Sequence, residues 1–261
     1  MLSNRERGGD RAQDAKSPGF CGVSGQAGTG SGCGSAGART CAGNGVNSGL
    51  VTYCNYPALA LFQGSFQECD GNDCSSNKGW TRYMFNKDGF QVIVYNTHTQ
   101  AGSGSDNVQT RIAQLNQIAV DAAVQRGINP GAVTFIVGDF NIDAWSSEFA
   151  NVRVAFESAG FVDTRGNLPC SPGFGNCTAC SSNTIKQIFG NDGTNTILDH
   201  ILYSPSIDGT VDIIPTNYEV KTFKRTDGGQ WCRNVIPTGC ADDLSDHEAI
   251  FGNFEIRRIV P

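Results

Sequence analysis

Short apolar runs alternate with amphipathic segments along most of the chain. Residues 90–95 (Phe-Gln-Val-Ile-Val-Tyr) follow the turn sequence Asn86-Lys87-Asp88-Gly89, which indicates a hairpin leading into a strand. Residues 132–137 (Ala-Val-Thr-Phe-Ile-Val) have no polar face, which is typical of a strand buried on both sides. Further strands are expected at residues 50–53, 58–62, 196–203 and 249–256.

Two helices are expected between these strands. In the first, one apolar face recurs at steps of four and three residues, at Val108, Ile112, Leu115, Ala119 and Ala122. Asp106 is the expected N-cap and Gly127 the expected end, with Pro130 beyond it. The second helix is expected from about residue 147 to 159. Strands that alternate with helices predict a layered α/β architecture.

The first part of the chain has a different composition from the rest. Residues 1–45 are rich in Gly, Ser and Cys, and such a segment cannot bury enough side chain to offset its ordering entropy. We therefore expect an irregular leader over residues 1–45 and one ordered domain over residues 46–261.

Composition excludes several classes of protein. Of the 261 residues, 39% are hydrophobic and 17% charged, which does not fit a disordered chain. The net charge of −6 gives no general attraction to phosphate backbones, so no specific nucleic-acid partner is expected. Eleven cysteines indicate an oxidising compartment, and we expect a secreted, extracellular protein. Since neither a transmembrane segment nor a secretory signal is visible, residue 1 is not expected to be the natural start.

The three histidines are His98, His200 and His247, and each lies in or at the end of an apolar run. Asp199 and Asp246 directly precede two of them. A carboxylate can hold an imidazole in one tautomer and raise its basicity, which is how a histidine becomes a positioned base. The alternative for any single histidine is a structural residue satisfied by the backbone.

Asp139 and Asn141 lie two positions apart at the carboxyl end of the expected strand 132–137, so their side chains should share a face. Open α/β sheets bind ligands at that edge. A carboxylate beside an amide suits a site that holds both a cation and a phosphoryl oxygen. The alternative is an ordinary Asx turn.

Four polar motifs follow one another in a fixed order: Asn96-Thr97-His98-Thr99-Gln100, Gly138-Asp139-Phe140-Asn141, Leu198-Asp199-His200 and Leu244-Ser245-Asp246-His247. This series resembles the endonuclease/exonuclease/phosphatase superfamily, which includes deoxyribonuclease I-like enzymes. Residues 69–79 (Cys-Asp-Gly-Asn-Asp-Cys-Ser-Ser-Asn-Lys-Gly) and 47–57 are similar to segments of its neutral sphingomyelinases. The resemblance covers residues 46–256.

The resemblance implies a four-layer αββα sandwich, in which two packed mixed β-sheets are flanked by helices. It also implies Mg²⁺-dependent, or other divalent-cation-dependent, hydrolysis of sphingomyelin or a related phospholipid at a membrane surface, with ceramide and phosphocholine as products. We expect the enzyme to be a monomer.

The same resemblance assigns roles to individual residues. His247 would be the general base, oriented by Asp199 or Asp246. His98 would bind phosphoryl oxygens or help to protonate the leaving alkoxide, and Asp139 and Asn141 would position the phosphate. The metal ligands would be Asp139, Asn141 and Asp246.

One part of the family pattern is missing. A strand with a catalytic Asn and a Gln-Glu with the principal metal ligand should precede Asn47, where this chain has its leader. Gln67-Glu68 follows the strand that it should precede, so chain order argues against it as a substitute. The N-terminal strands are therefore expected to be lacking, through truncation or degeneration, and metal affinity to be reduced. A metal-dependent nuclease of the same fold and a non-catalytic lipid-binding remnant are the alternative functions.

Cysteine spacing predicts two disulfides, Cys69–Cys74 and Cys232–Cys240, which would close short loops. Cys177 and Cys180 are expected to be a disulfide or free thiols, because a structural zinc site needs four ligands and no second Cys-x-x-Cys exists. Trp231 is a candidate for membrane contact, the alternative being a Trp packed on the neighbouring cysteines.

Overall fold

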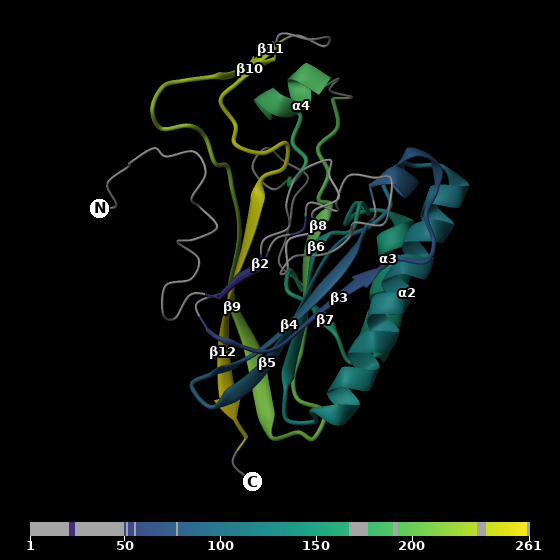
Figure 1. Ribbon diagram of the computed structural model, residues 1–261, viewed down its shortest axis with the longest axis vertical. Coiled ribbons are helices and arrows are strands. Elements are labelled where there is room, and N and C mark those ends of the chain that lie inside the picture. Colours follow the sequence, from purple (N-terminus) through teal and green to yellow (C-terminus); the bar gives the residue numbers. More distant parts are fainter. Residues whose placement is uncertain are drawn as a thin grey trace.

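The computed structural model describes residues 21–23, 50, 52–54, 56–76, 78–166, 177–189, 193–233 and 239–259. Its centre is a six-stranded mixed sheet (Figure 1). Only β5 and β6 run parallel, and every other neighbouring pair is antiparallel. In order across the sheet the strands are β3 (Ala58–Ser65), β4 (Gly79–Lys87), β5 (Phe90–His98), β6 (Val133–Asp139), β8 (Asp199–Ser204) and β7 (Val162–Asp163).

A second, antiparallel sheet packs against the first. It consists of β9 (Val211–Lys221) and β12 (Ala249–Arg258), with a register shift between Asn253 and Phe254. The Phe254 ring meets Phe135 of β6 edge-on, with 4.9 Å between the ring centroids. The apolar cluster between the sheets includes Val92, Val133, Tyr203, Val211 and Ile213.

The outer layer on the six-stranded sheet is helical. The helices α2 (Ser105–Ile128) and α3 (Ser147–Ser158) lie along that sheet (Figure 1). The larger core cluster joins them to it through Ile93, Tyr95, Leu115, Ile118, Ile136 and Phe149. The observed α/β architecture with two packed sheets confirms the expected fold class. None of the helices in the described ranges combines the length and apolarity needed to cross a bilayer.

The remaining described elements are short. They are η1 (Gly71–Ser75), α4 (Thr184–Phe189), and the strand pairs β1 (Cys21–Val23) with β2 (Thr52–Cys54) and β10 (Trp231–Arg233) with β11 (Gly239–Ala241). Because β1 lies within residues 1–45, the expected irregular leader contains one strand. The rest of that segment, and with it the question of further N-terminal strands, lies outside the described residues.

Several expected boundaries are wrong. Helix α2 has Gly104 as its N-cap, because the Gly104 N–H donates to Asn107 Oδ1 at 3.1 Å, and Asp106 lies in the first turn. Gly127 is still helical. The strand expected at 196–203 begins at Asp199, since Thr196 instead forms an isolated bridge with Ala179. Strand β9 was not predicted, and β4 was implied only as the first arm of the hairpin, without bounds.

Other local expectations are confirmed. The turn between β4 and β5 places Asp88 and Gly89 at φ values of 51° and 85°, as a two-residue hairpin turn requires. The disulfides Cys69–Cys74 and Cys232–Cys240 are both present. Cys177 and Cys180 form a third disulfide.

Candidate active site

Three polar side chains lie in one row across the six-stranded sheet. His98 at the end of β5 is in register with Asp139 at the end of β6, and Asp139 is in register with Asp199 at the start of β8. His247 approaches from the segment just before β12, in the second sheet. The site is therefore assembled from both sheets at one end of the sandwich.

These side chains are close enough to act on one group. His247 Nδ1 lies 2.8 Å from Asp199 Oδ2 and 3.9 Å from Asp139 Oδ2. His98 Nε2 lies 3.4 Å from the same Asp139 oxygen. These distances are short enough for the side chains to reach one phosphate group through hydrogen bonds.

Backbone conformation brings Asp139 to this position. Gly138 has a φ of 133°, and a Cβ there would lie 2.0 Å from the Thr97 carbonyl oxygen, so only glycine lets β6 come this close to β5. Beyond the strand, the Asn141 N–H donates to Asp139 Oδ1 at 2.7 Å. The Asx turn weighed as an alternative is thus present, and it helps to hold the Asp139 carboxylate in the site.

Asn141 lies beside the row but is engaged with the backbone. Its Nδ2 donates to the Thr99 carbonyl oxygen at 2.9 Å. Of the two polar atoms of the side chain, Oδ1 is therefore the one that could contact a ligand. Asp246 is exposed, and its carboxylate lies 3.5 Å from Ser245 Oγ. Of the two aspartates considered as the partner of His247, the structure places Asp199 against the imidazole.

His200 points to the opposite face of β8 from Asp199, as alternation along a strand requires. It is fully buried and stacks on Phe149, and its Nε2 lies 2.8 Å from the Ile142 carbonyl oxygen. Its Nδ1 lies 3.2 Å from Arg165. His200 is therefore the structural histidine of the three.

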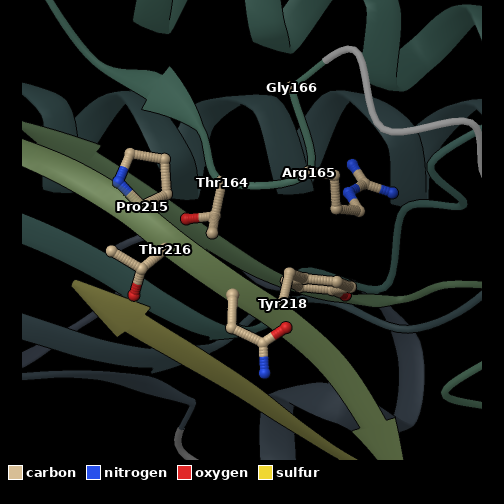
Figure 2. Close-up of a pocket in the computed structure, with 7 residues that line it drawn as sticks. Thr164, Arg165, Gly166, Pro215, Thr216 and Tyr218 are labelled. Atoms are coloured by element: carbon tan, nitrogen blue, oxygen red, sulfur yellow. The ribbon is translucent and has the colours of Figure 1, made fainter.

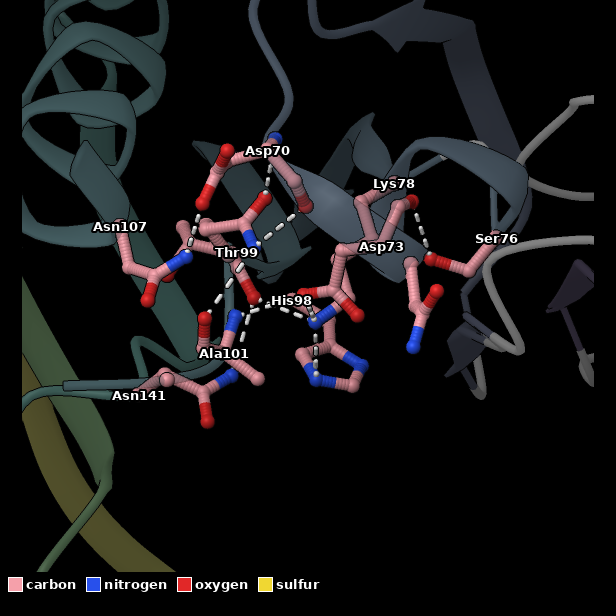
Figure 3. A network of polar contacts seen from close by, with 12 residues as sticks. Asp70, Asp73, Ser76, Lys78, His98, Thr99, Ala101, Asn107 and Asn141 are labelled. Atoms are coloured by element: carbon pink, nitrogen blue, oxygen red, sulfur yellow. Dashed lines mark hydrogen bonds and ion pairs between the residues drawn. The ribbon is translucent and has the colours of Figure 1, made fainter. Parts of the chain in front are cut away.

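Lys78 and Asp73 are two residues of the site that sequence reasoning missed (Figure 3). The Lys78 ammonium donates to His98 Nε2 at 3.1 Å and to the Thr99 carbonyl oxygen at 2.7 Å, and it pairs with Asp73 at 2.8 Å. All three N–H groups of the ammonium thus have an acceptor. The position of Lys78 within Asn-Lys-Gly was noted, but no periodic pattern marks a buried lysine.

The surroundings of His98 and His247 shift the pKa values of the two rings in opposite directions. Burial, reinforced by the charge of Lys78, lowers the pKa of His98 to about 4, so this ring is neutral. Since Nε2 accepts from Lys78, its proton is on Nδ1. Burial also acts to lower the pKa of His247, but the hydrogen bond and charge of Asp199, with Asp139 and Asp246, outweigh it and raise the pKa to about 9.

The two carboxylates of the row repel one another. Burial and then the charge of Asp199 raise the pKa of Asp139 well above its ordinary value. One ligand atom from each of Asp139, Asp199 and His247 lies within 4.8 Å of the others. A half-buried carboxylate pair with a histidine is a hard, oxygen-rich donor set that suits a divalent cation, which would relieve the repulsion.

Other features lie apart from this row. A cavity of about 460 Å³ opens between residues 164–166 and Pro215–Tyr218 of β9, and none of the candidate catalytic residues lines it (Figure 2). Glu68 is exposed, and its carbonyl oxygen accepts from Gln114. The side chain of Trp231 lies outside the described residues, so its membrane contact stays a prediction.

Known proteins are similar in sequence to parts of this chain. A phospholipase C of Staphylococcus aureus is 30% identical over 111 residues, which are 41% of this chain and 33% of the relative. A sphingomyelinase C of Leptospira interrogans is 31% identical over 109 residues, 40% of this chain and 19% of the relative. The match thus spans a third or less of these curated relatives.

The fold extends over more of the chain than these matches. A crystal structure of S. aureus beta toxin superposes with a TM-score of 0.64 at 24% identity, covering 80% of this chain and 69% of the toxin. The Endonuclease/Exonuclease/phosphatase family model matches residues 6–247, which begins within the expected leader and contains all four polar motifs. With the motifs, the two packed sheets and this match in agreement, the chain belongs to the Endonuclease/Exonuclease/phosphatase family.

Proposed function

We propose that this protein is a divalent-cation-dependent phosphodiesterase that hydrolyses sphingomyelin to ceramide and phosphocholine. The observation that carries the proposal is that four polar side chains converge at one end of the sandwich. His98 and Asp139 end strands β5 and β6, Asp199 begins β8, and His247 lies just before β12. Asp139 and Asp199 would hold the cation, for which we propose Mg²⁺. Bound there, the cation would neutralise the carboxylates and stabilise the charge that develops on the phosphoryl oxygens.

His247 is the proposed general base. The Asp199 carboxylate accepts, so the 2.8 Å contact fixes a proton on His247 Nδ1 and leaves Nε2 as the nitrogen that would exchange a proton with water. Without a cation the neighbouring carboxylates hold the pKa of His247 at about 9, and the ring is protonated at neutral pH. A cation held by Asp139 and Asp199 would neutralise their charge, lower this pKa and so free Nε2 to act as a base. Nε2 would take a proton from water as the water oxygen attacks phosphorus. The bond from phosphorus to the ceramide oxygen then breaks, the alkoxide takes a proton from solvent water to give ceramide, and His247 returns to solvent the proton that it took.

His98 is the proposed phosphate-binding histidine. As a neutral ring with its proton on Nδ1, it can donate to a phosphoryl oxygen. With a pKa of about 4 it is a poor store of a proton for the leaving group at neutral pH, which favours the first of the two roles expected for it.

Three observations support sphingomyelin as the substrate. Relatives that match part of the chain are named as a phospholipase C and a sphingomyelinase C. The net charge of −6 does not favour a polyanionic substrate such as DNA. The disulfides fit an oxidising compartment, so we propose an extracellular enzyme that meets the lipid at a membrane surface.

The test is incubation of the purified protein with Mg²⁺ and either sphingomyelin vesicles or supercoiled plasmid. Phosphocholine release that chelator and His247→Ala both abolish is the expected result. Asp88→Asn, in the turn at the opposite end of β5, is the matched control and should retain activity. Plasmid nicking without phosphocholine release would replace the proposal with a nuclease, and silence on both substrates would favour a non-catalytic domain.

A further inference from the structure

The Cys69–Cys74 disulfide closes a short loop. Asp70 and Asp73 of this loop contact the segment that follows β5 and the first turn of α2 (Figure 3). The Asp70 N–H donates to Gln100 Oε1 at 2.9 Å, and Gln100 Nε2 returns a bond to the Asp70 carbonyl oxygen at 3.0 Å. The Asp70 carboxylate accepts from Asn107 Nδ2 at 2.5 Å. Asp70 therefore joins the loop to the segment after β5 and to the first turn of α2.

Asp73 joins the same loop to the active site. Its Oδ2 accepts from the Ala101 N–H at 2.6 Å and pairs with the Lys78 ammonium at 2.8 Å. Lys78 in turn donates to His98 Nε2 at 3.1 Å. One carboxylate thus positions both the backbone three residues after His98 and the cation that contacts its ring.

Apolar packing contributes little to the shape of this loop, which leaves the disulfide and the polar contacts of Asp70 and Asp73 to hold it. Within η1 no residue is buried, and both cysteines are exposed. The internal hydrogen bonds are local, such as Ser75 Oγ to the Asn72 carbonyl oxygen at 2.7 Å. A short loop without an apolar anchor gains much of its order from a covalent closure.

We propose that the Cys69–Cys74 disulfide is a redox-sensitive clamp that keeps Asp70 and Asp73 in place and so positions Lys78 and His98. A dithiol in solution supplies two electrons and two protons. The S–S bond breaks, two thiols form, and the dithiol becomes a disulfide. The catalytic consequence rests on the proposed function, whereas the structural consequence does not.

The experiment compares Cys69→Ser/Cys74→Ser with the wild type by amide hydrogen exchange and by phosphodiester hydrolysis on a water-soluble substrate, p-nitrophenylphosphocholine. The clamp predicts that the Ala101 amide exchanges about tenfold faster or more in the variant, while core amides of β6 stay protected. It also predicts that kcat/KM falls about tenfold, because His98, the proposed phosphate-binding histidine, is no longer held in place.

Matched variants separate the clamp from general damage. Asp73→Asn keeps the disulfide and should reproduce the faster Ala101 exchange with an intact β6 core. Ser75→Ala, whose hydroxyl bonds only within the loop, should behave as the wild type. Cys232→Ser/Cys240→Ser opens a different short loop and should leave the Ala101 exchange rate unchanged.

Reduction itself is tested with dithiothreitol. Peptide mapping confirms that Cys69 and Cys74 are reduced, and kcat/KM should fall in the wild type and recover on reoxidation, with little change in Cys69→Ser/Cys74→Ser. The clamp is overturned if Ala101 exchange in that variant stays within about twofold of the wild type. If the oxidised wild type has no activity, the proposed function fails, and Ala101 exchange still decides whether the disulfide holds the loop.

Discussion

The pairing of His247 with Asp199 makes a quantitative prediction about the metal-free protein. The structure raises the pKa of His247 from 6.5 to about 9, and because burial opposes this rise, the neighbouring carboxylates must produce all of it. A rise from 6.5 to about 9 corresponds to about 3 kcal/mol of interaction that favours the protonated ring. Asp199→Asn should therefore lower the pKa of His247 from about 9 toward its ordinary value of 6.5, because the two largest causes of the rise are removed.

The assay is a histidine NMR titration in the presence of chelator, which is simplified because the chain has only three histidines. Asp246→Asn is the control: Asp246 is exposed and contributes least among the causes of the shift, so its removal should change the pKa by less than about half a unit. A pKa of His247 that stays near 9 in Asp199→Asn would refute the reasoning.

The same shift makes a prediction about stability. A histidine whose pKa is raised on folding stabilises the folded state fully below its unfolded pKa and loses that contribution as the pH rises through the folded pKa. The stability advantage of the wild type over Asp199→Asn should accordingly shrink by about 3 kcal/mol between pH 6.5 and just above pH 9. Urea unfolding at a series of pH values measures it, and a constant difference would contradict the pairing.

Three further predictions follow from the site. Lys78→Met should raise the pKa of His98 above about 4 but leave it below 6.5, since burial is the larger cause of the low pKa. Lys78→Arg keeps the positive charge and should keep the pKa low. Histidine NMR measures both variants, and an unchanged pKa in Lys78→Met would exclude the lysine as a cause. Gly138→Ala should destabilise the fold by more than about 3 kcal/mol in urea unfolding, because the added Cβ meets a carbonyl oxygen. Gly127→Ala, in open space within α2, should instead stabilise it by up to about 1 kcal/mol, and similar effects of both changes would be inconsistent with the close approach of β6 to β5. Asp139→Asn should weaken Mg²⁺ binding more than about tenfold in titration calorimetry and reduce the accompanying proton release, since the pKa of Asp139 is raised; equal affinity would place the cation elsewhere.

Much of the fold was readable from local pattern. The apolar run before Asp139 and the four-three spacing before Gly127 identify β6 and α2, because strand and helix periodicity depend only on near neighbours. Strand β9 could not be predicted in this way, because its apolar residues are interrupted by Asp212, Pro215 and Asn217. It is held as a strand by pairing along β12 and by packing on the six-stranded sheet, which are long-range contacts.

The candidate site was likewise predicted in part from the sequence, and the rest required the tertiary structure. The place of Asp139 at a strand end follows from the sequence. The resemblance carried by the order of the motifs added His98, Asp199 and His247 as candidates, together with Asn141 and Asp246. Only the tertiary structure decided that Asp199 rather than Asp246 pairs with His247, and that a buried Lys78 contacts His98. The reason is physical: periodicity reports which face a side chain takes, whereas strand register and the packing of one sheet on the other determine which distant atoms come within a hydrogen bond of each other.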